Sequence, residues 1–133
     1  MYLTYEEYKL YGGTADETTY NSIIYEAQAC VDYATFNRLK NEVEIPVEVK
    51  VCLTNIINLV NRKYKLLLAQ NEDDKEVMSM SNDGVSVSYN TISANDVISK
   101  VDYQIKQTIQ LFLSGIKNSE GKLLTYRGLY PNE

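Results

Sequence analysis

Residue types that carry out chemistry in enzymes occur in this chain without the partners they need. The sequence contains no histidine, which removes the commonest general base and rules out a Ser-His-Asp triad. Adjacent carboxylates at Glu6 and Glu7 fall early in a predicted helix, where acidic side chains complement the positive helix end. Gly12-Gly13 follows no predicted strand and precedes no GK[ST] motif, as a phosphate-binding loop would. These residues predict a protein that is not an enzyme, with no catalytic and no cofactor-binding residues.

The candidate metal ligands are also poorly arranged. The acidic run Glu72–Asp74, with Glu76, lacks the glycine and the ligand spacing of a calcium loop, so a solvated connector is expected. Cys30 and Cys52 stand singly within apolar helical patterns, which predicts two buried, reduced thiols. The first residues lack the basic and apolar regions of a signal peptide, and no apolar stretch is long enough for a bilayer. We therefore expect a cytosolic protein with no metal, no cofactor and no membrane partner.

Composition limits the class of partner. A chain of 133 residues with 44% hydrophobic residues is sufficient for one domain with a real core. A net charge of -5 argues against a surface built to neutralise phosphates. Tyrosine is over-represented, with 12 Tyr against 2 Phe and no Trp. Because tyrosine tolerates half-burial, this composition favours surfaces that become interfaces with other proteins.

Helical signals dominate the chain. Capping-box spacings at Thr4–Glu7, Thr14–Glu17 and Ser93–Asp96 predict three helix starts, and Pro46 predicts a fourth. The third helix is expected to end near Gln70, before the acidic run. Apolar residues at steps of three and four form three inward stripes. These stripes are Tyr20, Ile23, Ile24, Ala27, Cys30, Val31 and Ala34; Val49, Leu53, Ile56, Ile57, Val60, Tyr64, Leu67 and Leu68; and Val97, Val101, Ile105, Ile109, Phe112, Leu113 and Ile116.

One segment departs from this helical pattern. Val77–Ser81 and Val85–Tyr89 alternate like strands and are joined by Asn82-Asp83-Gly84, which predicts a β-hairpin over 77–89. Two strands alone are marginally stable in water, so such a hairpin would need support from a neighbour. The predicted fold is mainly α: a single domain with a small helical bundle over about 4–116, the hairpin inserted before its last long helix, and an extended C-terminal tail over about 120–133.

Two segments each allow two interpretations. The tail either folds back, burying Leu123, Leu124 and Leu129, or forms an arm that docks on another molecule through Tyr126, Arg127 and Tyr130. The cluster of Arg62, Lys63 and Lys65 is either a possible basic contact patch for DNA or the solvated outer face of a helix; the second is favoured because no recognition helix and no positive net charge accompany it.

Five stretches taken in order resemble the head–tail connector family of tailed bacteriophages and prophages, also called adaptor or head-completion proteins. LTYEEYKLYGG at Leu3–Gly13 resembles the opening helix and turn of that family. AQACVDYATFNRL, at Ala27–Leu39, is similar to its helix that ends in Val31-Asp32, Thr35 and Arg38. The remaining three stretches are the proline-started IPVEVKVCLTNII, the hairpin SNDGVSVSY and the closing LLTYRGL. The tyrosine content departs from the family pattern.

The resemblance implies a helical subunit of the virion head–tail junction, made in the host cytoplasm. Such subunits form a ring, typically a dodecamer, beneath the portal protein and continue the DNA channel without binding DNA specifically. The ring also receives the next connector, stopper or tail component. Interface contacts with other subunits or the portal would then come from the hairpin and the arm. The residues concerned are Asn82, Asp83, Gly84, Val85, Val87, Tyr89, Leu124, Tyr126, Arg127, Leu129 and Tyr130. The alternative is a small, cytosolic, phage-borne regulatory protein that associates with DNA.

Overall fold

The computed structural model describes residues 1–80 and 94–128, and in that part of the chain the fold is mainly α. Its helices, in order, are α1 (Tyr5–Leu10), α2 (Glu17–Ala34), α3 (Val47–Met80) and α4 (Ala94–Leu113). These ranges contain no strand; Lys117 and Leu123 form an isolated antiparallel β-bridge. The expected helical bundle is therefore confirmed for the described residues.

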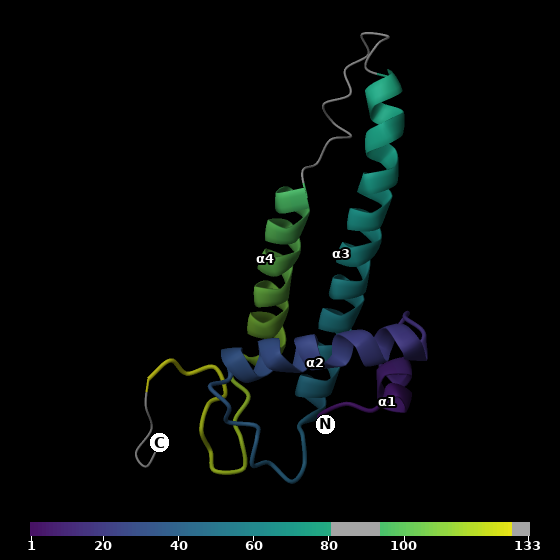
Figure 1. Ribbon diagram of the computed structural model, residues 1–133. Coiled ribbons are helices and arrows are strands. Elements are labelled where there is room, and N and C mark those ends of the chain that lie inside the picture. Colours follow the sequence, from purple (N-terminus) through teal and green to yellow (C-terminus); the bar gives the residue numbers. More distant parts are fainter. Residues whose placement is uncertain (81–93, 129–133) are drawn as a thin grey trace.

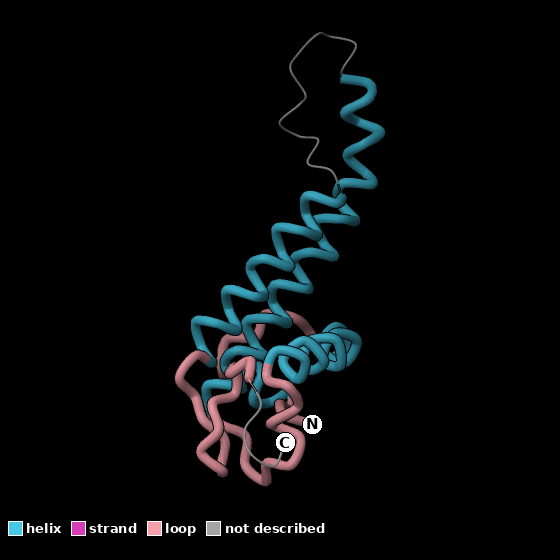
Figure 2. Tube along the Cα trace, turned by 90° about the vertical axis from the view of Figure 1, so that its left-hand side faces the viewer, coloured by secondary structure: helices cyan, strands magenta, loops and turns pink. Residues whose placement is uncertain are grey.

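The four helices form a stalk that rises from a broader base. α3 and α4 run side by side in opposite directions, with α3 extending further than α4 (Figures 1 and 2). α2 crosses the lower end of this pair, and the short α1 lies beside the base of α3 (Figure 1). The loops that precede α3 and follow α4 also gather at the base, so that most contacts between distant segments occur there (Figure 2).

The core follows the predicted stripes, but it ends before the last turns of the described stalk. Each helix other than α1 buries its apolar residues at steps of three and four against α3 or its neighbours. Lower down the stalk the prediction for α3 is confirmed as far as Val60, which is 1% exposed. Beyond it, Tyr64 and Leu68 are exposed at 43% and 67%, because neither α1 nor α2 reaches this height (Figure 1). Cys30 and Ala34 of α2 are only half-buried.

The third helix is longer than expected, and this corrects the prediction of its end. α3 continues through the acidic run to Met80 and does not end near Gln70. The first predicted strand is thus wrong over 77–80, which form the last turn of α3. Gln, Glu, Lys and Met are good helix formers, and they carried the helix past a run that was read as a connector. The rest of the predicted hairpin, including Val85–Tyr89, lies outside the described residues.

Two of the predicted helix starts are tested by the structure. Thr4 and Glu7 form the expected reciprocal capping box on α1, with both hydrogen bonds at 3.1 Å. For α2 the cap is Asp16, whose carboxylate accepts a hydrogen bond from the Thr19 N–H at 2.8 Å, and not Thr14. Asp is at least as good an N-cap as Thr, so the neighbouring residue took the role. The predicted cap Ser93 lies outside the described residues.

Tyr8 holds α1 to the start of α2 and to α3. Its buried hydroxyl donates to Asn58 Oδ1 at 2.6 Å and accepts from the Ala15 N–H at 2.9 Å and the Thr14 N–H at 3.1 Å. The backbone at Gly13 passes so close to the ring that a Cβ there would lie 2.3 Å from it. A glycine is therefore required for α1 to fold back over this ring.

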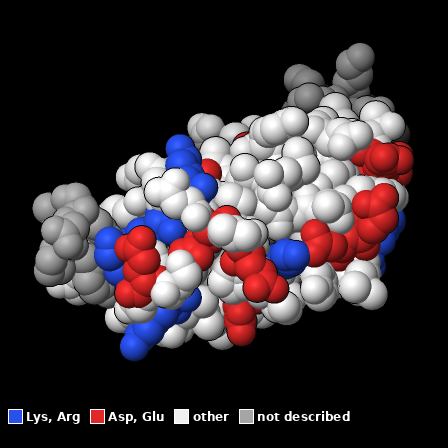
Figure 3. All heavy atoms as spheres, turned by 90° about the horizontal axis from the view of Figure 1, so that it is seen from below, with Lys and Arg blue, Asp and Glu red and all other residues white. Residues whose placement is uncertain are grey.

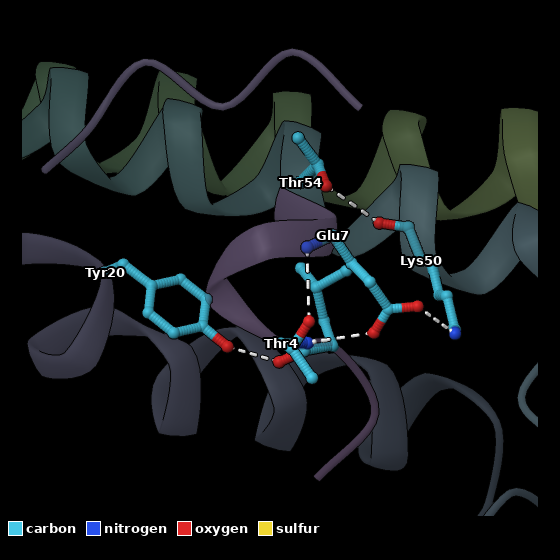
Figure 4. A network of polar contacts seen from close by, with 6 residues as sticks. Thr4, Glu7, Tyr20, Lys50 and Thr54 are labelled. Atoms are coloured by element: carbon cyan, nitrogen blue, oxygen red, sulfur yellow. Dashed lines mark hydrogen bonds and ion pairs between the residues drawn. The ribbon is translucent and has the colours of Figure 1, made fainter. Parts of the chain in front are cut away.

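Glu7 also links α1 to α3 through an ion pair with Lys50 (Figure 4). The hydrogen bond from Lys50, together with the Thr4 cap, lowers the pKa of the Glu7 carboxyl below its usual 4.5. A lowered carboxyl pKa stabilises the fold above the unfolded-state value, and this contribution is lost as the pH falls through the folded value. Glu7 therefore contributes stability at neutral pH and none in strong acid.

We expect Glu7→Gln to lower the free energy of unfolding at pH 7 by less than about 1 kcal/mol, as for other solvent-exposed ion pairs. Glutamine still completes a capping box, so the variant tests the charge alone. Urea unfolding in steps from pH 7 to below pH 4.5 should show the difference from wild type shrinking to zero. Glu6→Gln, on the exposed side of the same helix, is the control. A difference that is independent of pH would contradict this account.

Candidate functional site

The turn between α2 and α3 directs an arginine into the molecule. α2 ends at Ala34, and the Thr35 hydroxyl then donates to the Val31 carbonyl at 2.7 Å. Phe36 and Asn37 follow with left-handed φ values of 54° and 60°. These two residues reverse the chain direction, and the next side chain, Arg38, points inward and is only 8% exposed.

Arg38 binds the backbone of the C-terminal segment. One guanidinium nitrogen, Nη1, donates to the carbonyls of Leu123, Leu124 and Tyr126 at 2.9, 3.1 and 2.6 Å. The other, Nη2, donates to the carbonyl of Gly128 at 2.9 Å. The planar guanidinium suits this role because its donors form a rigid fork. A single side chain thus fixes the path of four residues that lie more than eighty positions away in the sequence.

Two aromatic rings flank the same guanidinium. The Arg38 Cζ atom lies 5.1 Å from the Phe36 ring centroid and 5.9 Å from that of Tyr126. Both distances are in the range of a cation–π interaction. Phe36 and Tyr126 are nevertheless 48% and 47% exposed, so their outer edges face solvent. The Arg38 site therefore ends at the surface in two half-exposed aromatic side chains.

A tight loop brings the C-terminal segment to Arg38. After α4, the Asn118 side chain accepts hydrogen bonds from the N–H groups of Glu120 and Lys122 at 3.0 and 2.9 Å. The Leu124 N–H then donates to the Ile116 carbonyl at 3.0 Å, and the Leu124 side chain is fully buried in the core. Glu42, from the loop before α3, accepts from the Ser119 hydroxyl at 3.0 Å. The segment thus folds back onto its own molecule up to Gly128.

The structure separates the predicted interface residues of the tail. Leu124 is 0% exposed within its own chain, so it is not available to a partner, and its assignment to the interface is corrected. Tyr126 and Arg127 are exposed. The other proposed interface residues fall outside the described part of the chain. They are Asn82, Asp83, Gly84, Val85, Val87, Tyr89, Leu129 and Tyr130.

The predicted basic patch is divided by the helix. Arg62 and Lys65 are exposed, as expected for the outer face of α3. Lys63 is only 9% exposed and lies 3.9 Å from the Glu26 carboxylate of α2, so its predicted outward placement is wrong. The Tyr64 hydroxyl donates to the same carboxylate at 3.1 Å. Lys63 and Tyr64 thus bind α2 to the stalk, and the outward patch is reduced to two cations.

The two thiols are not activated for chemistry. Burial raises the pKa of Cys52 to about 12 and also raises the pKa of the half-buried Cys30. Cys52 is buried as predicted, and the two cysteines are free. Among residues 1–80 and 94–128, no three His, Cys, Asp or Glu side chains are grouped to hold a metal ion. None of the helices within those same ranges is both long and apolar enough to cross a bilayer.

Several large apolar side chains that the sequence stripes left aside are exposed on the outer faces of the helices. Tyr25 and Tyr33 of α2 are 68% and 87% exposed, and Tyr103 and Leu111 of α4 are 64% and 77% exposed. Sequence reasoning passed over these four residues because it followed only the inward stripes. The signal was available: each lies off the inward stripe of its own helix, at a position where a soluble surface favours charge.

No family model, no curated protein and no solved structure matches this chain.

Proposed function

We propose that this protein is a non-enzymatic structural subunit of a tailed bacteriophage or prophage. It assembles with other copies into a ring beneath the portal protein, joins head to tail at that junction and continues the DNA channel. It has no cofactor. Its partners are further copies of itself, the portal protein and the next connector or tail component. The sequence resemblance given above is the starting point of this proposal.

The observation that carries the proposal is how the resembling stretches meet in space. The opening stretch contacts the proline-started stretch through Glu7 with Lys50 and Tyr8 with Asn58. The stretch that ends α2 contacts the closing LLTYRGL stretch through Arg38. Chance similarities between short peptides give no reason for those peptides to bind one another. Here the polar contacts that shape the base of the molecule run between four of the five stretches.

The alternative, a DNA-associated regulatory protein, has less support. It relied on Arg62, Lys63 and Lys65 acting together on one outer face. With Lys63 turned towards Glu26, two outward cations remain on that part of α3. Phosphate binding gains affinity from each neutralised phosphate, so two cations provide a weak electrostatic footprint. We therefore favour the assembly function.

The test is the mass of the protein in solution, measured by light scattering over a wide concentration range. The same measurement is repeated with the portal protein encoded in the same genome. We expect a closed ring, or a chain that adds to the portal in the portal's own symmetry. A parallel titration with duplex DNA at low salt should show little binding. A small species that ignores the portal and binds DNA, with affinity falling steeply as salt rises, would replace the connector by the regulator.

A further inference from the structure

The outer face of α2 is aromatic and acidic. Tyr25 and Tyr33 lie eight positions apart on this face, with the small, exposed Ala29 between them. Within α2 the charged residues are Glu17, Glu26 and Asp32, with no Lys or Arg. The two rings therefore sit in a field of one sign. We define the outer face of α2 by Tyr25, Ala29 and Tyr33.

The outer face of α4 has the same apolar spacing and the opposite surroundings. Tyr103 and Leu111 are also eight positions apart, with the polar, exposed Gln107 between them. We define the outer face of α4 by these three residues. Lys and Arg outnumber Asp and Glu from Lys100 to Arg127. The charged residues in this range are Lys100, Lys106, Lys117, Lys122 and Arg127 against Asp102 and Glu120.

The two faces match in spacing as well as in charge. Eight residues of helix rise about 12 Å, so each face presents two protruding apolar side chains at the same separation. The residue between them is small on α2 and flat and polar on α4, which leaves room for a facing side chain. Equal spacing lets two helices register along their length when they pack.

The two faces belong to different sides of one molecule. α4 packs along α3, whereas α2 crosses the base of this pair (Figures 1 and 2). Seen from below, Lys and Arg gather mainly towards the end that carries the C-terminal segment, while Asp and Glu spread across the centre and the opposite end (Figure 3). One chain therefore cannot satisfy its own two faces, but two copies can satisfy each other's.

We propose that the outer face of α2 on one copy binds the outer face of α4 on the next copy, as the head-to-tail contact of an assembly. This inference rests on the ring assembly proposed above and names the contact that builds it. A head-to-tail contact requires two different, complementary surfaces on each subunit, which is the arrangement found here. The aromatic and apolar pairs provide the buried centre of the contact, and the unlike charges around them set its orientation.

The test uses the full chain and two variants, one for each face. The first is Tyr25→Ser with Tyr33→Ser, and the second is Tyr103→Ser with Leu111→Ser. All four side chains are exposed, so both variants should keep the helical circular dichroism and the urea midpoint of wild type. Val43→Ser, which removes a fully exposed apolar side chain from the loop before α3, is the control. Association is measured by sedimentation up to about 1 mM protein, at low and at high salt.

We expect the wild-type and Val43→Ser chains to associate, and to do so more weakly at high salt because the opposed charges are screened. Each face variant alone should associate at least about tenfold more weakly. Mixed together, the two variants should form a one-to-one dimer and nothing larger, since each supplies the face that the other lacks. That complementation is specific to a head-to-tail contact.

Three outcomes would overturn the contact. They are a wild-type chain that is monomeric at the highest concentration, association lost in only one variant as in a symmetric α2–α2 dimer, and face variants that associate like wild type. The contact and the function fail separately. Portal-bound rings that tolerate both variants would keep the connector function and reject this contact. Complementing dimers from a protein that never binds a portal would keep the contact and reject the function.

Discussion

Replacing Arg38 by methionine is expected to lower the free energy of unfolding by about 3 kcal/mol and to release the C-terminal segment. Methionine fills much of the same volume but leaves the carbonyls of Leu123, Leu124, Tyr126 and Gly128 without their shared donor. Hydrogen bonds from a charged group contribute about 1.5–3 kcal/mol each, and part of this is recovered as water reaches the freed carbonyls. Arg38→Lys should restore only a part, because an ammonium cannot reproduce the planar fork.

Urea unfolding and amide hydrogen exchange would measure the two effects. In Arg38→Met, the Leu124 N–H, which donates to the Ile116 carbonyl, should exchange much faster than in wild type. Arg127→Met is the matched control, since Arg127 lies exposed in the same segment and should change stability by under about 0.5 kcal/mol. If Arg38→Met exchanged and unfolded like the control, Arg38 would not be what holds the segment. Under the connector proposal the same variant should also weaken assembly wherever Tyr126 and Arg127 contribute to it.

The second large effect is expected at Tyr8, where replacement by phenylalanine should cost about 2 kcal/mol. The ring remains, so the core keeps its packing, but the hydroxyl that joins α1, α2 and α3 is lost. The buried Ala15 N–H then has no acceptor, and leaving a buried donor unsatisfied costs about 1–3 kcal/mol. The Thr14 N–H is less affected, because it also donates to Asn58 Oδ1 at 3.2 Å.

Thermal and urea unfolding of Tyr8→Phe would be compared with Tyr5→Phe. The Tyr5 ring packs in the same aromatic group, with its centroid 5.5 Å from that of Tyr20, yet its hydroxyl makes no hydrogen bond to any residue that the structure describes. Loss of that hydroxyl should change stability by under about 0.5 kcal/mol. Equal effects of the two substitutions would show that the Tyr8 hydroxyl does not join the three helices as the geometry indicates.

Local patterns predicted the helical part of the fold where the signals were short in range. The capping box at Thr4 and the inward stripes of α2 and α4 were read correctly because caps and periodicity act within a few turns. The prediction failed at the end of α3, where helix propensity and an alternating pattern competed over the same residues. It also continued the buried stripe of α3 too far, since burial at Tyr64 and Leu68 depends on which other helix is present at that height.

By itself, the sequence determined a mainly helical chain without histidine chemistry, its inward apolar faces and the excess of acid at its N-terminal end. Only the tertiary structure showed that Arg38 binds the C-terminal segment, that Lys63 faces Glu26 and that Leu124 belongs to the core. It likewise revealed that α2 and α4 leave apolar side chains on two different sides of the molecule. The physical reason is range: caps and periodicity are encoded over a few residues, whereas the partner of a buried charge is chosen by contacts between segments far apart in the chain.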